Sequence, residues 1–76
     1  MKVTLYTKSE CGLCEDAERL LRKLQKTARF ELEIVDIEGD EEVYRRYWDR
    51  IPVVKVEDEE VGAPIDEMRL RALIAA

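Results

Sequence analysis

Two cysteines, Cys11 and Cys14, stand at a spacing that suits redox chemistry, and they are the only thiols of the chain. Gly12 and Leu13 separate them, so on a helix the two sulfur atoms would lie on one face and could form a bridge. In such a pair, one thiolate attacks a substrate disulfide and the second thiol resolves the mixed disulfide. The same spacing occurs in unreactive structural pairs and in halves of metal sites, so the pattern alone leaves three readings open.

Residue types that are missing bear on these alternatives. A chain of 76 residues without histidine has no Ser-His-Asp triad, no Cys-His pair and no ordinary zinc ligand set. A zinc site would need carboxylates or a second chain to complete its four ligands. A metal or cluster carrier that bridges two chains through Cys11 is the weaker alternative. We expect thiol chemistry and no bound metal.

The sequence places the first cysteine where a strand gives way to a helix. Residues 2–7 are β-rich and predict a strand, and apolar residues recurring every three or four positions predict a helix over residues 12–27. The amino end of a helix offers unpaired N–H groups and a positive dipole end, which lower the pKa of a thiol there below about 8.5. We therefore expect Cys11 to be the accessible nucleophile and Cys14, one turn further, to be the partly covered resolving cysteine. Lys8 would support the thiolate, and neighbouring carboxylates would oppose it.

The rest of the chain predicts three more strands and two more helices. The strands are expected over residues 30–34, 53–56 and 60–65, and the helices follow two good N-cap residues, Asp40 and Asp66. The order β-α-β-α-β-β-α implies an α/β fold with one mixed four-stranded sheet and helices on both faces. The first and last helices should share one face of the sheet, and the short middle helix should cover the other.

Details of packing are also expected around the middle helix and the fourth strand. Val43, Tyr44 and Tyr47 predict the packing face of the middle helix, and Trp48 would join the two tyrosines in an aromatic cluster. A glycine and a proline within residues 60–65 predict an edge strand with a bulge or bend.

Ile51 and Pro52 form the second functional signal. The proline ends the middle helix, because the residue before a proline avoids the α-helical region. In the context of the cysteine pair we expect a cis bond between them. A cis bond would leave the preceding backbone free to pair with an extended peptide.

Together these motifs resemble the glutaredoxin branch of the thioredoxin fold over nearly the whole chain. The resemblance is carried by residues 4–8 before the cysteine pair, by the run Ile51-Pro52-Val53-Val54, and by Asp66 at the start of the last helix. It is strongest to a small bacterial glutaredoxin-like family. It implies a thioredoxin-like fold with the strand order 2-1-3-4.

The resemblance also implies roles for residues around the cysteines. The backbone of the residue before the cis-proline would pair with the substrate, and Lys8 would hold a carboxylate of glutathione. Where glutaredoxins have proline and tyrosine between the cysteines, this chain has glycine and leucine, and their Gly-Gly turn and Asp pair are replaced by Gly-Ala-Pro-Ile-Asp-Glu. The resulting substrate-binding candidates are Lys8, Gly12, Leu13, Ile51, Pro52 and Asp66.

The expected function is thiol-disulfide exchange by a single domain over residues 1–76. A formal net charge of −5 argues against binding to nucleic acids and anionic membranes. Neither a membrane-spanning run nor a signal peptide is visible, so we expect a cytoplasmic monomer. Its partners would be a disulfide-containing protein or small thiol and an electron-donating reductase or thiol. Glutathione or a dithiol would serve as reductant, with no tightly bound cofactor. The alternative is a non-catalytic thioredoxin-like module that senses redox state or docks a partner.

Overall fold

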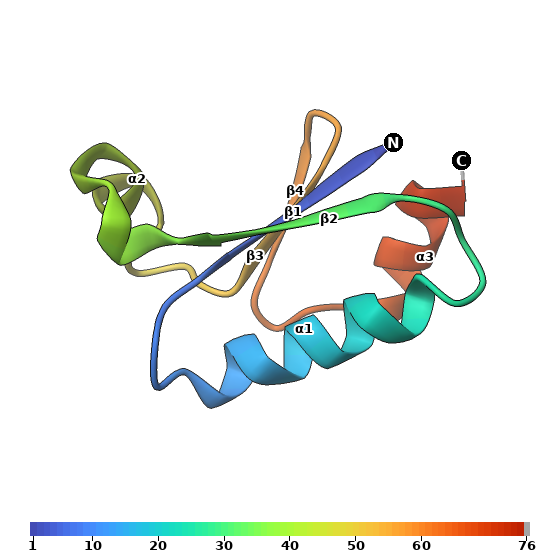
Figure 1. The fold of residues 1–76 in the computed structure, drawn as a ribbon, viewed down its shortest axis with the longest axis horizontal. Helices are drawn as coiled ribbons and strands as arrows, with labels where there is room; N and C mark the ends of the chain where they lie inside the picture. Colours follow the sequence, from blue (N-terminus) through green and yellow to red (C-terminus); the bar gives the residue numbers. More distant parts are fainter. Residues whose placement is uncertain (76) are drawn as a thin grey trace.

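A computed structural model describes residues 1–75 and shows one mixed sheet of four strands (Figure 1). β1 pairs in parallel with β2 and antiparallel with β3, and β3 pairs antiparallel with β4, which gives the order β2-β1-β3-β4. The predicted α/β fold class and the strand order 2-1-3-4 are therefore confirmed. The strands are β1 (Lys2–Thr7), β2 (Glu31–Asp36), β3 (Val53–Val56) and β4 (Glu59–Gly62).

Helices cover both faces of this sheet. The long helix α1 (Gly12–Leu24) and the last helix α3 (Glu67–Ala75) lie on one face, as Figure 1 shows. The short helix α2 (Glu41–Tyr47) follows the single turn η1 (Ile37–Gly39) and covers one end of the other face. This division between the two faces is the one that the sequence predicts.

The main core lies between the sheet and the helices α1 and α3. Because side chains alternate along a strand, Val3 and Leu5 of β1 point to this face, where Leu21 of α1 and Leu70 of α3 contact them. All four side chains are fully buried, and burial of each contributes about 1.5–3 kcal/mol. A second, smaller core of Ile37, Tyr47 and Val53 lies under α2.

The predicted bounds of one helix and two strands are wrong. The second strand spans residues 31–36 rather than 30–34, because all six residues of β1 pair with it, from Lys2 with Glu31 to Thr7 with Asp36. The first helix ends at Leu24 rather than at residue 27, because the N–H groups of Lys26 and Thr27 bond three residues back and tighten the chain into a turn. The fourth strand spans residues 59–62 rather than 60–65. Gly62 pairs with Val53, the first residue of β3, so nothing remains for later residues to pair with.

The prediction of an aromatic cluster around α2 is also wrong. Tyr47 is buried, but Tyr44 and Trp48 are exposed, because a helix of seven residues turns only one narrow face to the sheet. Val43 and Tyr47, four residues apart, occupy that face. The partner of Tyr47 is instead Tyr6 of β1, and the centroids of the two stacked rings are 4.1 Å apart.

Candidate functional site

The two cysteines lie at the start of α1 and form a disulfide, with their Cα atoms 5.2 Å apart. Cys11 is the N-cap residue, and its extended backbone (φ −117°, ψ 103°) turns the chain into the helix. The Cys11 sulfur accepts a hydrogen bond from the backbone N–H of Cys14 at 3.2 Å. The sulfur thus occupies the position where a capping oxygen would satisfy the first unpaired N–H groups of a helix.

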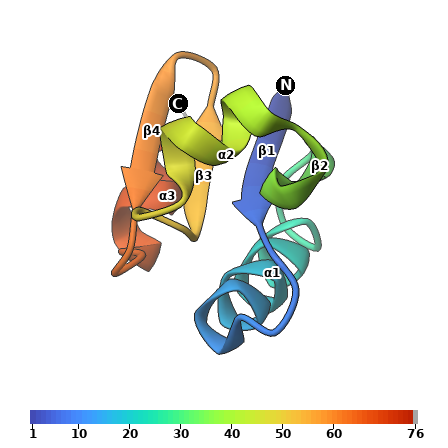
Figure 2. The same ribbon diagram turned by 90° about the vertical axis from the view of Figure 1, so that its left-hand side faces the viewer.

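The two sulfur-bearing residues differ in accessibility. Cys14 is only 2% exposed, whereas Cys11, at the amino end of α1, is half-buried. Glu10, just before it, adopts a left-handed conformation with φ 58°, which turns the loop sharply into the helix. Figure 2 shows this loop descending from the end of β1 to the first turn of α1. The Ser9 hydroxyl donates to the Glu38 carboxylate at 3.1 Å and ties the loop to η1.

A groove of about 440 Å³ opens beside the disulfide, between the first half of α1 and the segment that joins β4 to α3. Leu13, which stands between the cysteines and is 65% exposed, lines one side. Pro52, joined to Ile51 by a cis peptide bond as expected, lines it as well. The full lining is Leu13, Asp16, Ala17, Leu20, Pro52, Ala63, Pro64 and Ile65.

The other substrate-binding candidates do not line this groove. Asp66 accepts hydrogen bonds from the N–H groups of Met68 (2.9 Å) and Arg69 (3.3 Å), so it caps α3. Lys8 is exposed in the loop between β1 and α1. Ile51 packs against the core under α2. A Cβ atom added to Gly12 would have no neighbouring atom within 4 Å, so the space around this residue does not require glycine.

Several groove residues were missed by sequence reasoning. Ala17 and Leu20 share a stripe with Leu13, and their helical spacing was interpreted only as a core face. Ile65 follows a second cis bond, between Ala63 and Pro64, and the sequence pattern predicts for this proline only a bulge or bend within an edge strand. The signal that could have revealed the groove is the exposed end of the apolar stripe of α1, next to the cysteines.

Tyr47, Arg50 and Glu60 form a polar clamp that holds the segment leading to Pro52. The Tyr47 hydroxyl donates to a Glu60 carboxylate oxygen at 2.6 Å, and burial, followed by this hydrogen bond, raises the pKa of Tyr47 to about 12. Arg50 lies over the Tyr47 ring, 5.0 Å from its centroid, and pairs with Glu60 at 3.5 Å. The clamp therefore joins the end of α2 to the edge strand β4.

Two further observations concern other classes of site. Within residues 1–75, no group of three or more cysteine, aspartate or glutamate side chains is arranged to hold a metal ion. No helix in the same range is long and apolar enough to cross a membrane.

Comparison with protein families gives one match. Residues 2–75 match the model described as "Glutaredoxin-like domain (DUF836)". A comparison with curated proteins finds none that matches the chain.

Solved structures share the fold over nearly the whole chain. Protein Ne2328 from Nitrosomonas europaea is 38% identical, with a TM-score of 0.81 over 96% of this chain and 89% of its own. Target protein XcR50 from X. campestris is 34% identical, with a TM-score of 0.77 over 97% of each chain. A mutant thioredoxin from Halobacterium salinarum is 23% identical, with a TM-score of 0.72 over 96% of this chain and 70% of its own, and shows a common fold.

Proposed function

Because the chain belongs to the family of glutaredoxin-like domains (DUF836), we propose that it is a small thiol-disulfide oxidoreductase whose reactive dithiol is Cys11 and Cys14. The observation that carries this proposal is the sulfur of Cys11, which caps α1 and accepts the N–H of Cys14 at 3.2 Å. In the reduced protein a thiolate at this place gains the same hydrogen bond and the positive end of the helix. Both effects lower the pKa of the Cys11 thiol.

The proposed reaction runs in two exchanges. The Cys11 thiolate attacks one sulfur of a substrate disulfide, which forms a mixed disulfide and releases the other substrate sulfur as a thiolate. Cys14 then loses its proton and attacks the Cys11 sulfur, which forms the Cys11–Cys14 disulfide and releases the second substrate thiolate. The substrate gains two electrons and two protons, and the dithiol loses them. A thiol or dithiol, glutathione included, returns the two electrons.

The accessibility of the two cysteines supports this assignment of roles. A nucleophile must meet a sulfur of another molecule, and half-buried Cys11 is the more open of the pair. A resolving cysteine needs only to reach Cys11, which buried Cys14 already does. The backbone of Ile51, before the cis bond to Pro52, would pair with an extended substrate. Together with Lys8, Gly12, Leu13 and Asp66, these residues stay candidates for substrate binding.

The proposed setting follows from the proposed chemistry. A dithiol that must return to its reduced form suits a compartment where glutathione or thioredoxin systems keep thiols reduced, so we place the protein in the cytoplasm. We propose that it acts as a monomer. Its partners would be disulfide-containing proteins or small thiols, and an electron-donating reductase or thiol.

Turnover with matched cysteine variants tests the proposal. The wild type should reduce a model peptide disulfide with a dithiol as electron donor, and Cys11→Ser should abolish this activity. Mixed with the peptide disulfide in the absence of the dithiol, Cys14→Ser should instead retain the mixed disulfide, which mass spectrometry detects. Equal turnover by the wild type and Cys11→Ser would refute the proposal. No turnover, a Cys11 pKa near 8.5 and partner binding that survives Cys11→Ser would favour the non-catalytic docking module.

A further inference from the structure

The groove beside the disulfide is almost wholly apolar. Seven of its eight lining residues have apolar side chains, and Asp16 is the only ionisable one. Its volume of about 440 Å³ falls within the range of small-ligand pockets, about 300–1,000 Å³. The groove is therefore large enough for an apolar side chain together with some of its backbone.

The position of the groove ties it to the proposed reaction. Leu13 stands between the two cysteines, and Pro52 directly follows the residue whose backbone would pair with a substrate. A substrate whose cysteine meets Cys11 therefore brings the neighbouring residue to the mouth of the groove. Leu13 is 65% exposed, so an apolar side chain there would remove apolar surface of both molecules from water.

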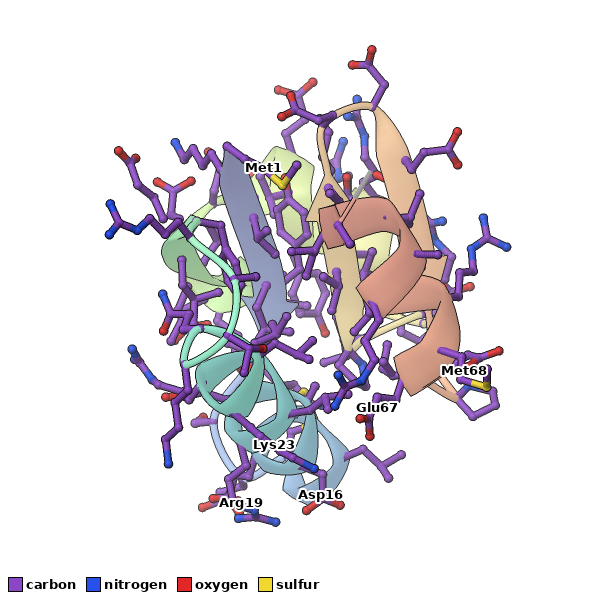
Figure 3. All side chains as sticks on the ribbon, turned by 90° about the vertical axis from the view of Figure 1, so that its right-hand side faces the viewer. Met1, Asp16, Arg19, Lys23, Glu67 and Met68 are labelled. Carbon is purple, nitrogen blue, oxygen red and sulfur yellow. A yellow bond between two sulfur atoms is a disulfide. The ribbon has the colours of Figure 1, made fainter. Side chains whose placement is uncertain are left out.

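The lining of the groove holds no cationic side chain that could pair with an anionic substrate. Figure 3 shows Asp16 on α1 and Glu67 at the start of α3, the helices near which the groove opens. Arg19 pairs with Asp16 and Arg71 pairs with Glu67, so each carboxylate already has a partner. Arg19, Arg71 and Lys8 do not line the groove. Glutathione carries two carboxylates and one ammonium group, and the groove offers its carboxylates no cation. A carboxylate placed there would lose water without gaining a partner.

We infer that this groove selects peptide disulfides with an apolar residue next to the cysteine, and that it disfavours glutathione. The inference rests on the proposed function and names the substrate class of the same site. The bonds that form and break are those of the proposed thiol-disulfide exchange. Specificity comes from the side chain beside the reacting sulfur, because hydrophobic pockets discriminate by about 10- to 200-fold for small differences in apolar size.

Three disulfide substrates test the inference directly. Two are symmetric disulfides of one short peptide that carries either leucine or aspartate next to its cysteine, and the third is glutathione disulfide. The wild type should show kcat/KM at least about tenfold higher for the leucine peptide than for the aspartate peptide, with glutathione disulfide no better than the latter.

Three variants locate the preference in the groove. Leu13→Ser should reduce the leucine preference, mainly through KM, and a parallel measurement of redox potential separates this effect from altered cysteine chemistry. Asp16→Lys should raise kcat/KM for glutathione disulfide and for the aspartate peptide. Met68→Ser is the matched control, because Met68 follows the groove segment and is 80% exposed but does not line the groove. It should leave all three substrates unchanged.

The possible outcomes separate the inference from the proposed function. Equal kcat/KM for the two peptides, or a clear preference for glutathione disulfide, would overturn the inference and leave the oxidoreductase intact. Turnover of none of the three substrates would overturn both together. A leucine preference that Leu13→Ser leaves unchanged would also overturn the inference, since the groove would then not be its source.

Discussion

Replacing Tyr47 with phenylalanine should change how the stability of the protein depends on pH. Tyr47 is 2% exposed, and its hydroxyl donates to Glu60 at 2.6 Å. A hydrogen bond to a charged group contributes about 1.5–3 kcal/mol, and partial exposure of Glu60 reduces this figure. At pH 8 we therefore expect Tyr47→Phe to lower the free energy of unfolding by about 1–2 kcal/mol.

The raised pKa of Tyr47 sets the pH range of the effect. Burial and the hydrogen bond to Glu60 favour the protonated phenol and raise its pKa from 10.0 to about 12 in the folded chain. The stabilisation is therefore complete below pH 10 and is lost as pH rises from 10 to 12. At pH 11, ionisation of the tyrosine favours the unfolded wild-type chain about tenfold, or by about 1.4 kcal/mol, and a phenylalanine at this position cannot ionise.

Urea unfolding of the oxidised protein at pH 8 and pH 11, followed by circular dichroism, measures this difference. The advantage of the wild type over Tyr47→Phe in the free energy of unfolding should shrink by about 1.4 kcal/mol between the two pH values. Tyr44→Phe is the matched control, because Tyr44 is an exposed tyrosine of the same helix, and it should follow the wild type. A Tyr47→Phe difference that stays constant from pH 8 to pH 11 would refute the reasoning.

Three further predictions concern other local features. Glu57→Gly should raise the free energy of unfolding by about 0.5–1 kcal/mol, because φ at Glu57 is 55° in the turn between β3 and β4; a lower urea midpoint would contradict this. Asp40→Ala should cost about 1 kcal/mol in the same assay, because the Asp40 carboxylate accepts two N–H groups of α2 at 2.9 and 3.2 Å, and Asp40→Asn should restore most of the loss. The hydrogen bond from Arg71 lowers the pKa of the Glu67 carboxyl below 4.5, so its stabilisation is present above pH 4.5 and is lost as pH falls through the folded pKa. Arg71→Gln should raise the Glu67 midpoint in an NMR titration, and an unchanged midpoint would show that this hydrogen bond is not its cause.

The sequence predicts elements whose signals are local. The helical stripe of α1 and the alternation of Val3 and Leu5 in β1 follow from periods of 3.6 and 2, which the sheet and helix themselves impose. The position of Cys11 at a helix start follows from the same two patterns. The capping role of Asp40 was equally visible, because it depends only on the residues that follow it.

Features set by distant segments could not be predicted in this way. The end of β4 at Gly62 depends on where its partner β3 begins. The exposure of Tyr44 depends on how little of the sheet a short helix covers, and no periodicity in the sequence reports that area. The groove brings together α1, Pro52 and residues 63–65, so its residues belong to one site only after the chain has folded.

The disulfide closes a ring that contains only the first turn of α1. Because the ring is so small, the disulfide raises the free energy of the unfolded chain by only about 2 kcal/mol. A cross-link between distant segments would raise it much more. Breaking the bond should therefore leave the sheet and both cores in place. In the proposed function, the protein would therefore gain and lose two electrons in each cycle without rearranging its scaffold.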